Sequence, residues 1–167
     1  MAISAPRPAL AVAVALVLGC LALLVSPAQA GDKAPDFVLS DAEGKMVSLK
    51  QYRGRPLVLH FWATWCPYCK KVQPGLEALE SRYQERKLVV LAISFREDDG
   101  ADPQGVLKRR GHSFTTLLEG DDVAAMYHVR GTPTTFFIDP KGRVVGMTHT
   151  SDPKDPVLVE LADAITQ

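Results

Sequence analysis

The segment Phe61–Lys70, which reads FWATWCPYCK, is the stretch on which the fold assignment depends. It joins a nearly continuous apolar run, Pro56–Trp62, to a stretch with helical periodicity, and it places Cys66 and Cys69 at the junction. An apolar run of this kind is typical of a central strand that is buried on both faces. We therefore expect a buried strand followed by a helix whose first turn carries both cysteines.

The spacing of the two cysteines suits a disulfide that opens and closes. Residues three apart lie on one face of a helix, with Cβ atoms about 5–6 Å apart, and a small adjustment then permits a disulfide. Unpaired backbone N–H groups and the helix dipole favour a thiolate on Cys66, at the helix N-terminus. Cys69 lies one turn further in, so it is the predicted resolving thiol. Pro67 suits the first turn, where no N–H is needed.

Two other roles for the cysteine pair fit the pattern less well. A purely structural disulfide that closes so small a ring would restrain the unfolded chain very little. A metal site would require further ligands at metal spacing, and the sequence has no second Cys pair. The four histidines are scattered along the chain, at His60, His112, His128 and His149. The pattern favours redox chemistry without metal or cofactor, and a copper-delivery module remains the alternative.

The rest of the chain predicts a single α/β domain. Turn signals and periodicity indicate a hairpin over 37–49, strands over 57–62, 88–93 and 114–118, helices over 67–86, 104–110 and 121–127, a second hairpin over 134–148 and a last helix over 155–165. Early strands separated by helices and a late hairpin predict one mixed sheet with helices on both faces. Outside these elements, His112, His128 and the acidic run Glu97–Asp99 are expected at the surface, and His149 is given no role.

The first thirty residues differ from the rest. Met1–Ala30 has one charged residue, Arg7, and an apolar stretch that ends before the small-x-small sequence Ala28-Gln29-Ala30. This pattern predicts a signal peptide cleaved after Ala30, with a retained membrane anchor as the alternative. Lipidation at Cys20 fits less well, because apolar residues continue beyond it. Each version exports a domain of residues 31–167.

Composition narrows the function classes further. The chain has 167 residues, is 47% hydrophobic, and balances Lys+Arg 19 against Asp+Glu 19. The apolar content excludes intrinsic disorder, and the balanced charge gives no electrostatic footprint for nucleic acid. Only one pair of the three cysteines lies in the exported part, which is too few for a disulfide scaffold.

Several segments together resemble the exported TlpA/ResA/CcmG-like thiol:disulfide oxidoreductases, which have the thioredoxin fold. Besides FWATWCPYCK, the matching positions are Ala34–Phe37, Tyr52–Gly54, Pro74 and Gly131–Phe136. The resemblance implies a thioredoxin-like fold with an N-terminal β-hairpin. It also implies an enzyme that exchanges disulfides with protein substrates as a monomer. A bacterial periplasmic or outer-face location, a membrane electron donor, and a task in cytochrome c maturation or metal-site assembly are further implications.

The resemblance also assigns roles to residues around the cysteines. Pro133 falls where the family has a cis-proline facing the disulfide. Thr132 would then offer its backbone N–H and C=O to an extended substrate. Trp65 would shield the sulfurs and contact the partner protein. Tyr68, with Pro67, forms a dipeptide similar to that of glutaredoxins.

The sequence departs from the family at the positions that would manage the Cys69 proton. Val72 stands where ResA-like proteins have a glutamate, and His60 stands where thioredoxins bury an aspartate. Alternation along the strand places His60 on the same face as Trp62. The resemblance implies that this face lies beneath the helix that carries the cysteines, near Cys69. A neutral imidazole there can accept the Cys69 proton; the alternative is a core histidine bonded to backbone. The redox direction stays open, with the reductive side favoured.

A peroxidase is the third function considered. Its reactive cysteine would lie in a P-x-x-x-T-x-x-C pattern, and the corresponding positions before Cys66 are Leu59 and Ala63. The sequence therefore does not favour it.

Overall fold

The computed structural model describes residues 31–167, so the predicted signal peptide lies outside the described residues. The chain begins there with an antiparallel hairpin of β1 (Val38–Ser40) and β2 (Met46–Ser48). A 3-10 turn, η1 (Leu49–Tyr52), then leads into the first strand of the main sheet. The hairpin agrees with the sequence prediction.

The central sheet is mixed, as predicted. Its strands are β3 (Leu57–Trp62), β4 (Val89–Ser94), β5 (Thr115–Leu117), β6 (Thr134–Ile138) and β7 (Val144–Thr148). They lie in the order β5-β4-β3-β6-β7. β3, β4 and β5 run parallel, whereas β6 is antiparallel to both β3 and β7. The segment that carries Cys66 and Cys69 therefore directly follows the middle strand, β3.

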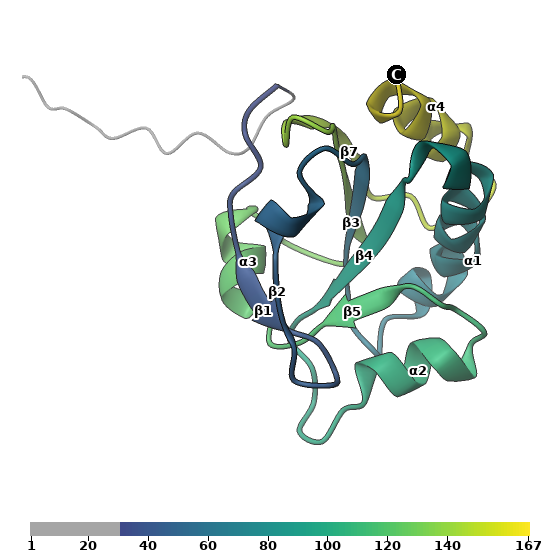
Figure 1. Ribbon diagram of the computed structural model, residues 1–167. Helices are drawn as coiled ribbons and strands as arrows, with labels where there is room; N and C mark the ends of the chain where they lie inside the picture. Colours follow the sequence, from purple (N-terminus) through teal and green to yellow (C-terminus); the bar gives the residue numbers. More distant parts are fainter. Residues whose placement is uncertain (1–30) are drawn as a thin grey trace, which may run out of the picture.

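Helices cover both faces of this sheet (Figure 1). They are α1 (Pro67–Arg82), α2 (Pro103–Arg109), α3 (Asp121–Met126) and α4 (Pro156–Ile165). α1 ends four residues earlier than expected, and a short 3-10 turn, η2 (Gln84–Arg86), continues it. Lys87 then adopts a left-handed conformation, φ 57°, which ends the helical path. No helix within residues 31–167 has the length and hydropathy needed to cross a bilayer.

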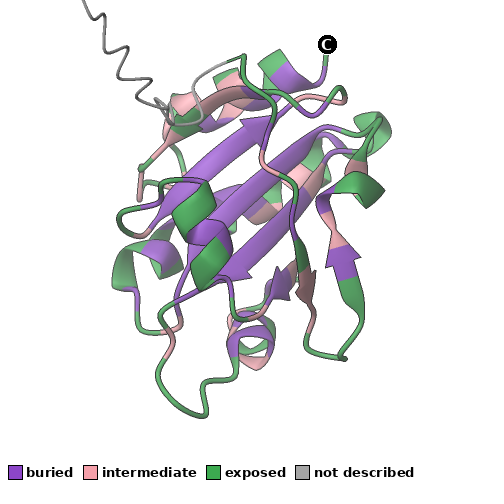
Figure 2. Cartoon of the chain, turned by 90° about the vertical axis from the view of Figure 1, so that its left-hand side faces the viewer, coloured by how far each residue is buried: buried purple, intermediate pink, exposed green. Residues whose placement is uncertain are grey.

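The middle strand β3 separates two cores, and all six of its residues are buried (Figure 2). Leu57, Leu59 and Phe61 pack on one face with the hairpin and α3. Val58 and Trp62 pack on the other face with α1, α4 and both cysteines. Burying an apolar side chain of this size stabilises the fold by about 1.5–3 kcal/mol. The redox helix thus rests on a rigid support.

His112 corrects one sequence expectation. It is buried rather than at the surface, with 8% of its area exposed, and its ring stacks on Phe114 at 5.5 Å. Burial lowers its pKa, and the carboxylate of Glu77, 3.7 Å from Nδ1, acts in the opposite direction. The expectation was wrong because the sequence predicts that the helix over 104–110 stops at Gly111, but not that the next residues then contact Glu77 of α1.

Candidate active site

Cys66 and Cys69 form a disulfide across the first turn of α1, with Cα atoms 5.3 Å apart. Cys66 is the N-cap residue, and its Sγ accepts the backbone N–H of Cys69 at 3.0 Å. Pro67 occupies the first helical position, where its missing N–H leaves no bond unmade. Cys66 is 2% exposed and Cys69 is fully buried. The two sulfurs therefore differ mainly in the helix N–H that only Cys66 receives.

Two exposed aromatic side chains flank the disulfide. Trp65 is 52% exposed, and its indole N–H donates to the Arg96 carbonyl at 2.8 Å. Tyr68 is 56% exposed, and the Lys71 ammonium lies 5.4 Å from its ring centre. Large exposed aromatic rings with one polar anchor are common at protein contact sites. Both rings are therefore available to a partner that approaches the sulfurs.

The loop before β6 lies beside the redox helix. The Thr132–Pro133 peptide bond is cis. Tyr68, Thr132 and Pro133 line one shallow groove, so the structure brings the loop and the redox turn together. The backbone N–H and C=O of Thr132 form no hydrogen bond with any residue of the described chain. They are therefore free to pair with an extended peptide.

His149 belongs to this loop, which sequence reasoning missed. Its Nδ1 lies 3.0 Å from the Thr134 hydroxyl and 3.2 Å from the Pro133 carbonyl. Because a carbonyl only accepts, Nδ1 is the protonated ring nitrogen that donates to it. The register of β6 and β7, with Thr135 opposite Thr148, places residue 149 opposite residue 134. Counting along the predicted late hairpin was the signal that could have found His149.

The segment before Cys66 is held by two charged side chains from other loops. The Glu97 carboxylate accepts the Thr64 N–H at 3.0 Å and the Thr64 hydroxyl at 2.6 Å. Arg110 donates to the Thr64 carbonyl at 3.1 Å and stands 5.7 Å from the centre of the Trp62 ring. The expectation that Glu97 belongs to a solvated loop was wrong. This three-residue contact, the Thr64 clamp, ties the redox loop to the chain on either side of α2.

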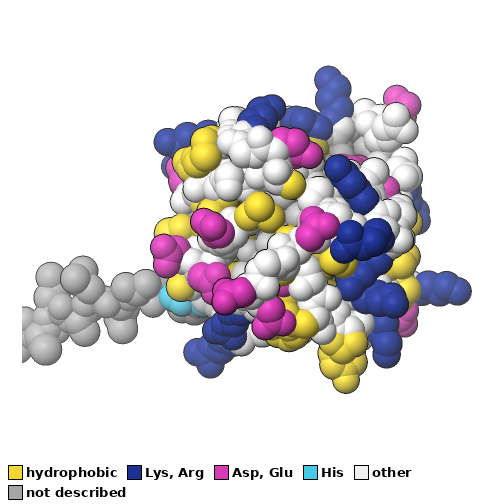
Figure 3. All heavy atoms as spheres, turned by 90° about the horizontal axis from the view of Figure 1, so that it is seen from below, with side chains coloured by type: hydrophobic (Ala, Val, Ile, Leu, Met, Phe, Trp, Pro, Cys, Tyr) yellow, Lys and Arg dark blue, Asp and Glu magenta, His cyan; other side chains and the backbone are white. Residues whose placement is uncertain are grey.

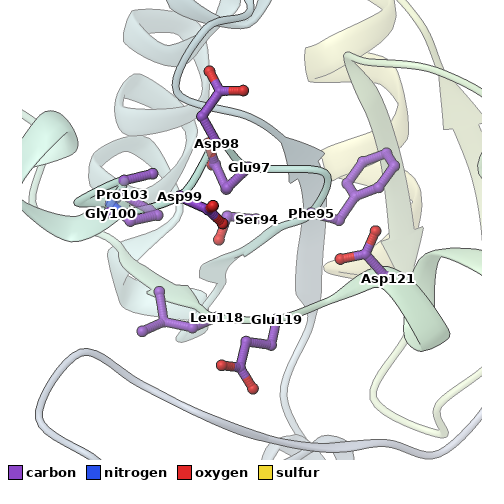
Figure 4. A pocket seen from close by; sticks show the side chains of 11 residues that line it. Ser94, Phe95, Glu97, Asp98, Asp99, Gly100, Pro103, Leu118, Glu119 and Asp121 are labelled. Carbon is purple, nitrogen blue, oxygen red and sulfur yellow. The ribbon is translucent and has the colours of Figure 1, made fainter.

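An acidic hollow of about 340 Å³ lies next to the clamp, on the side of β4. The loop that follows β4 supplies one wall, and Leu118 and Glu119 supply the other (Figure 4). Its carboxylates are Glu97, Asp98, Asp99, Glu119 and Asp121. Viewed from below, acidic side chains gather on one half of the molecule and several Lys and Arg side chains on the other (Figure 3). The surface is therefore electrically uneven despite the balanced composition.

His60 lies on the cysteine side of the sheet, opposite Thr135 of β6. It is fully buried, and its Nδ1 lies 2.9 Å from the Thr135 hydroxyl. Its Nε2 has no partner among the described residues. Burial lowers the pKa of His60 to about 3. The imidazole is therefore neutral at physiological pH, and its bond is to a side chain rather than to backbone.

Comparison with known proteins fits this geometry. The AhpC/TSA family profile matches residues 30–147, which is most of the chain. The chain belongs to the AhpC/TSA family. The chain is also 33% identical to the thiol-disulfide oxidoreductase ResA of Halalkalibacterium halodurans over 141 residues, which is 84% of this chain and 79% of the relative. It is 36% identical to ResA of Bacillus thuringiensis over 118 residues, covering 70% of this chain and 68% of the relative.

Solved structures with a similar fold include disulfide-exchange proteins. A Chlorobium tepidum protein described as a thiol:disulfide interchange protein, DsbE, superposes with a TM-score of 0.76 and 30% identity. It covers 83% of this chain and 99% of its own. A secreted Mycobacterium tuberculosis disulfide oxidoreductase superposes at 0.66, with 24% identity over 77% of this chain and 95% of its own. This AhpC/TSA protein is a thiol-disulfide oxidoreductase of the ResA/DsbE type with a thioredoxin-like fold.

Proposed function

We propose that this oxidoreductase is exported and reduces disulfides in partner proteins, with Cys66 as nucleophile and Cys69 as resolving thiol. The observation that carries the assignment is the bond from the Cys69 N–H to Cys66 Sγ. A backbone N–H aimed at one sulfur stabilises negative charge there, which lowers the pKa of a thiol and makes it the better nucleophile and leaving group.

The reaction begins with both cysteines reduced. The Cys66 thiolate attacks one sulfur of a substrate disulfide, so a Cys66–substrate bond forms and the substrate S–S bond breaks, releasing a thiolate that takes up a proton. Cys69, deprotonated, then attacks Cys66 Sγ, which restores the Cys66–Cys69 disulfide and releases the second substrate thiolate. The enzyme loses two electrons and the substrate gains them. The two substrate thiolates take up two protons in total, one that Cys69 gave up and one from solvent, because Cys66 begins as a thiolate.

Neighbouring residues would hold the substrate during this exchange. Thr132 pairs its free backbone groups with the substrate next to the attacked sulfur, and cis-Pro133 keeps that edge close to the cysteines. Trp65 and Tyr68 cover the mixed disulfide from either side. These roles rest on the exposure of the two rings and on the shared groove.

His60 would contribute as a neutral hydrogen-bonding group near Cys69. An imidazole whose pKa is lowered to about 3 is a weak base, so it does not hold the Cys69 proton for long. Its unpartnered Nε2 instead offers one hydrogen bond in the cysteine core. We expect the resolving step to slow in His60→Asn.

The wider setting follows from the same proposal. The domain acts as a monomer outside the cytoplasmic membrane of a bacterium, after cleavage near Ala30 or on a retained anchor. A membrane electron donor reduces it again, and cytochrome c maturation or metal-site assembly uses its product. No group of three or more His, Cys, Asp or Glu side chains suited to a metal occurs within residues 31–167, so no observation favours the copper-delivery alternative.

Trapping of mixed disulfides tests the assignment of the two cysteines. Cys69→Ser should accumulate protein–protein disulfides through Cys66 in the cells that produce it, because the resolving step is lost. The matched variant Cys66→Ser should trap few. Equal trapping by both variants would overturn the assignment.

The reduction potential of the pair tests the direction. A reductase should have a value nearer to roughly −270 mV, as in thioredoxin, than to roughly −120 mV, as in DsbA. A value above about −170 mV would reassign the protein as an oxidase or isomerase.

A further inference from the structure

The groove at the cis-proline loop continues past the residues that the proposed function uses. It has a volume of about 450 Å³ and runs from Tyr68 and Pro133 to the end of β7. Its lining also includes Arg130, His149 and Ser151. The His149 ring forms a fixed wall, because Nδ1 bonds the Pro133 carbonyl. The groove is therefore formed by the cis-proline loop and the segment after β7, together with Tyr68 of the turn that carries the cysteines.

The residues that line this groove include a positive charge, on Arg130, and no negative charge. No aspartate or glutamate lines it. The Arg130 side chain is exposed, and it forms no ion pair with any residue in 31–167. A guanidinium donates up to five hydrogen bonds and matches a carboxylate in a two-point contact. The hydroxyl of Ser151, which also lines the groove, adds a further donor.

We propose that this groove selects substrates that carry a carboxylate side chain near the cysteine that Cys66 attacks. The proposal rests on the reductase function above. A peptide paired with Thr132 presents the same face at every second residue, about 7 Å apart. A side chain two positions from the attacked cysteine would therefore extend along the groove toward Arg130. The Arg130 guanidinium would attract Asp or Glu there and repel Lys or Arg.

Short synthetic peptides can measure this preference. Each carries one cysteine in a mixed disulfide with 5-thio-2-nitrobenzoate, and has Glu, Gln or Lys two positions to either side. The purified, reduced protein should release the coloured thiol about five- to tenfold faster from the better Glu peptide than from its Lys counterpart at low salt. Arg130→Glu should reverse the order.

A charge change far from the groove provides the control. Lys87 follows η2, beyond the opposite end of α1 from Cys66, so Lys87→Glu should keep the preference for Glu peptides. Equal rates for Glu, Gln and Lys peptides would overturn the charge selection while leaving the reductase function in place. Failure to release thiol from any peptide would overturn both.

A second inference rests on a different observation, a buried donor in α1. Gln73 is fully buried, and its side-chain oxygen accepts a hydrogen bond from Arg110 at 2.9 Å. A guanidinium only donates, so the amide atom that meets it must be the oxygen. The amide nitrogen of Gln73 consequently has no partner within residues 31–167.

The position of Gln73 points to an acceptor that the disulfide form lacks. Gln73 follows Cys69 by four residues, so the two share one face of α1, and helical side chains lean toward the N-terminal turn. We infer that Gln73 donates a hydrogen bond to the Cys69 sulfur once the disulfide is reduced. Arg110 fixes the amide and makes it a better donor. Gln73 is thus a positioning residue that favours the dithiol form.

Gln73→Met tests this, because methionine has a similar size but no N–H. The equilibrium constant for reduction of the disulfide by glutathione should fall about tenfold. The lost contact with Arg110 affects both redox forms and cancels in this comparison. Stability supplies a second readout: the variant should lose more unfolding free energy in the dithiol form than in the disulfide form. Equal losses with an unchanged equilibrium would reduce Gln73 to packing.

Discussion

A single buried imidazole couples the stability of this protein to pH. The pKa of His60 is about 3 in the folded protein, against an ordinary value of 6.5, because burial disfavours the charged ring. Below pH 6.5 the unfolded chain therefore binds a proton that the folded chain does not bind. The stability that His60 contributes is complete above pH 6.5 and declines as the pH falls toward 3.

Replacing His60 should remove this pH dependence. The wild type should lose up to about 2 kcal/mol of unfolding free energy through His60 between about pH 7.5 and pH 5. His60→Asn should show a smaller loss over the same range. Urea titrations at the two pH values measure it, and His112, present in both proteins, contributes equally. An identical pH dependence in the variant would contradict the burial that the structure gives His60.

Residue chemistry was predictable where a short motif carries it. The spacing of the cysteines was sufficient to predict the disulfide-forming pair, whereas the cis peptide bond at Pro133 was predicted from the family resemblance. Strand alternation placed His60 on the same face as Trp62, and the resemblance placed that face beneath the cysteines; the structure agrees with both. The sequence could not predict the Thr135 hydroxyl as the partner of His60, because that contact depends on the register of β3 against β6. The contacts of His149 with Thr134 and Pro133 were missed because they depend in the same way on the register of β6 against β7.

At the scale of elements, the Thr64 clamp joins loops that are distant in sequence. Glu97 follows β4 and Arg110 follows α2, and both bond the short link between β3 and α1. No local pattern marks either residue, since each lies in a polar stretch that reads as an ordinary surface. Such contacts arise only after the parallel strands β3 and β4 have paired and brought their ends together.

Glu97→Ala should therefore destabilise the protein more than alanine substitution of a neighbouring acidic residue in the same loop. The N–H and hydroxyl of Thr64 would lose their acceptor in a partly buried site, which costs about 1–3 kcal/mol. Asp99→Ala removes the same charge from the same loop, where no hydrogen bond is lost, and should change stability by less than about 0.5 kcal/mol. Urea unfolding compares the two. Similar losses would mean that charge, rather than the clamp, matters.

For the whole molecule, the element order was correctly predicted, because buried strands and amphipathic helices have clear periods. The close approach of α1 to the chain before α4 was not predictable. A Cβ atom built on Gly75 would lie 2.5 Å from the Pro153 carbonyl oxygen and 2.8 Å from its Cα. Both are backbone atoms and cannot rotate away. Gly75 is therefore required by packing between segments that are far apart in sequence.

Gly75→Ala should destabilise the protein by about 2 kcal/mol, as overpacking does, although alanine is the better helix former by about 1 kcal/mol. The exposed position Ala78 in the same helix calibrates that propensity, since Ala78→Gly should cost about 1 kcal/mol. Thermal or urea unfolding of both variants measures the balance. A stabilised Gly75→Ala would show that α1 and the Pro153 segment are not in contact.

The disulfide joins residues only three positions apart at one end of α1, and both cores extend well beyond it. No strand pairing involves that bond, so we expect reduction to leave both packed layers in place. The protein can therefore be oxidised and reduced repeatedly at this one site without unfolding. We therefore expect the disulfide and dithiol forms to have the same overall shape. A protein that donates or accepts electrons would then distinguish the two forms only by direct contact with the Cys66–Cys69 site. Specific electron transfer therefore depends on brief, selective contacts at that site.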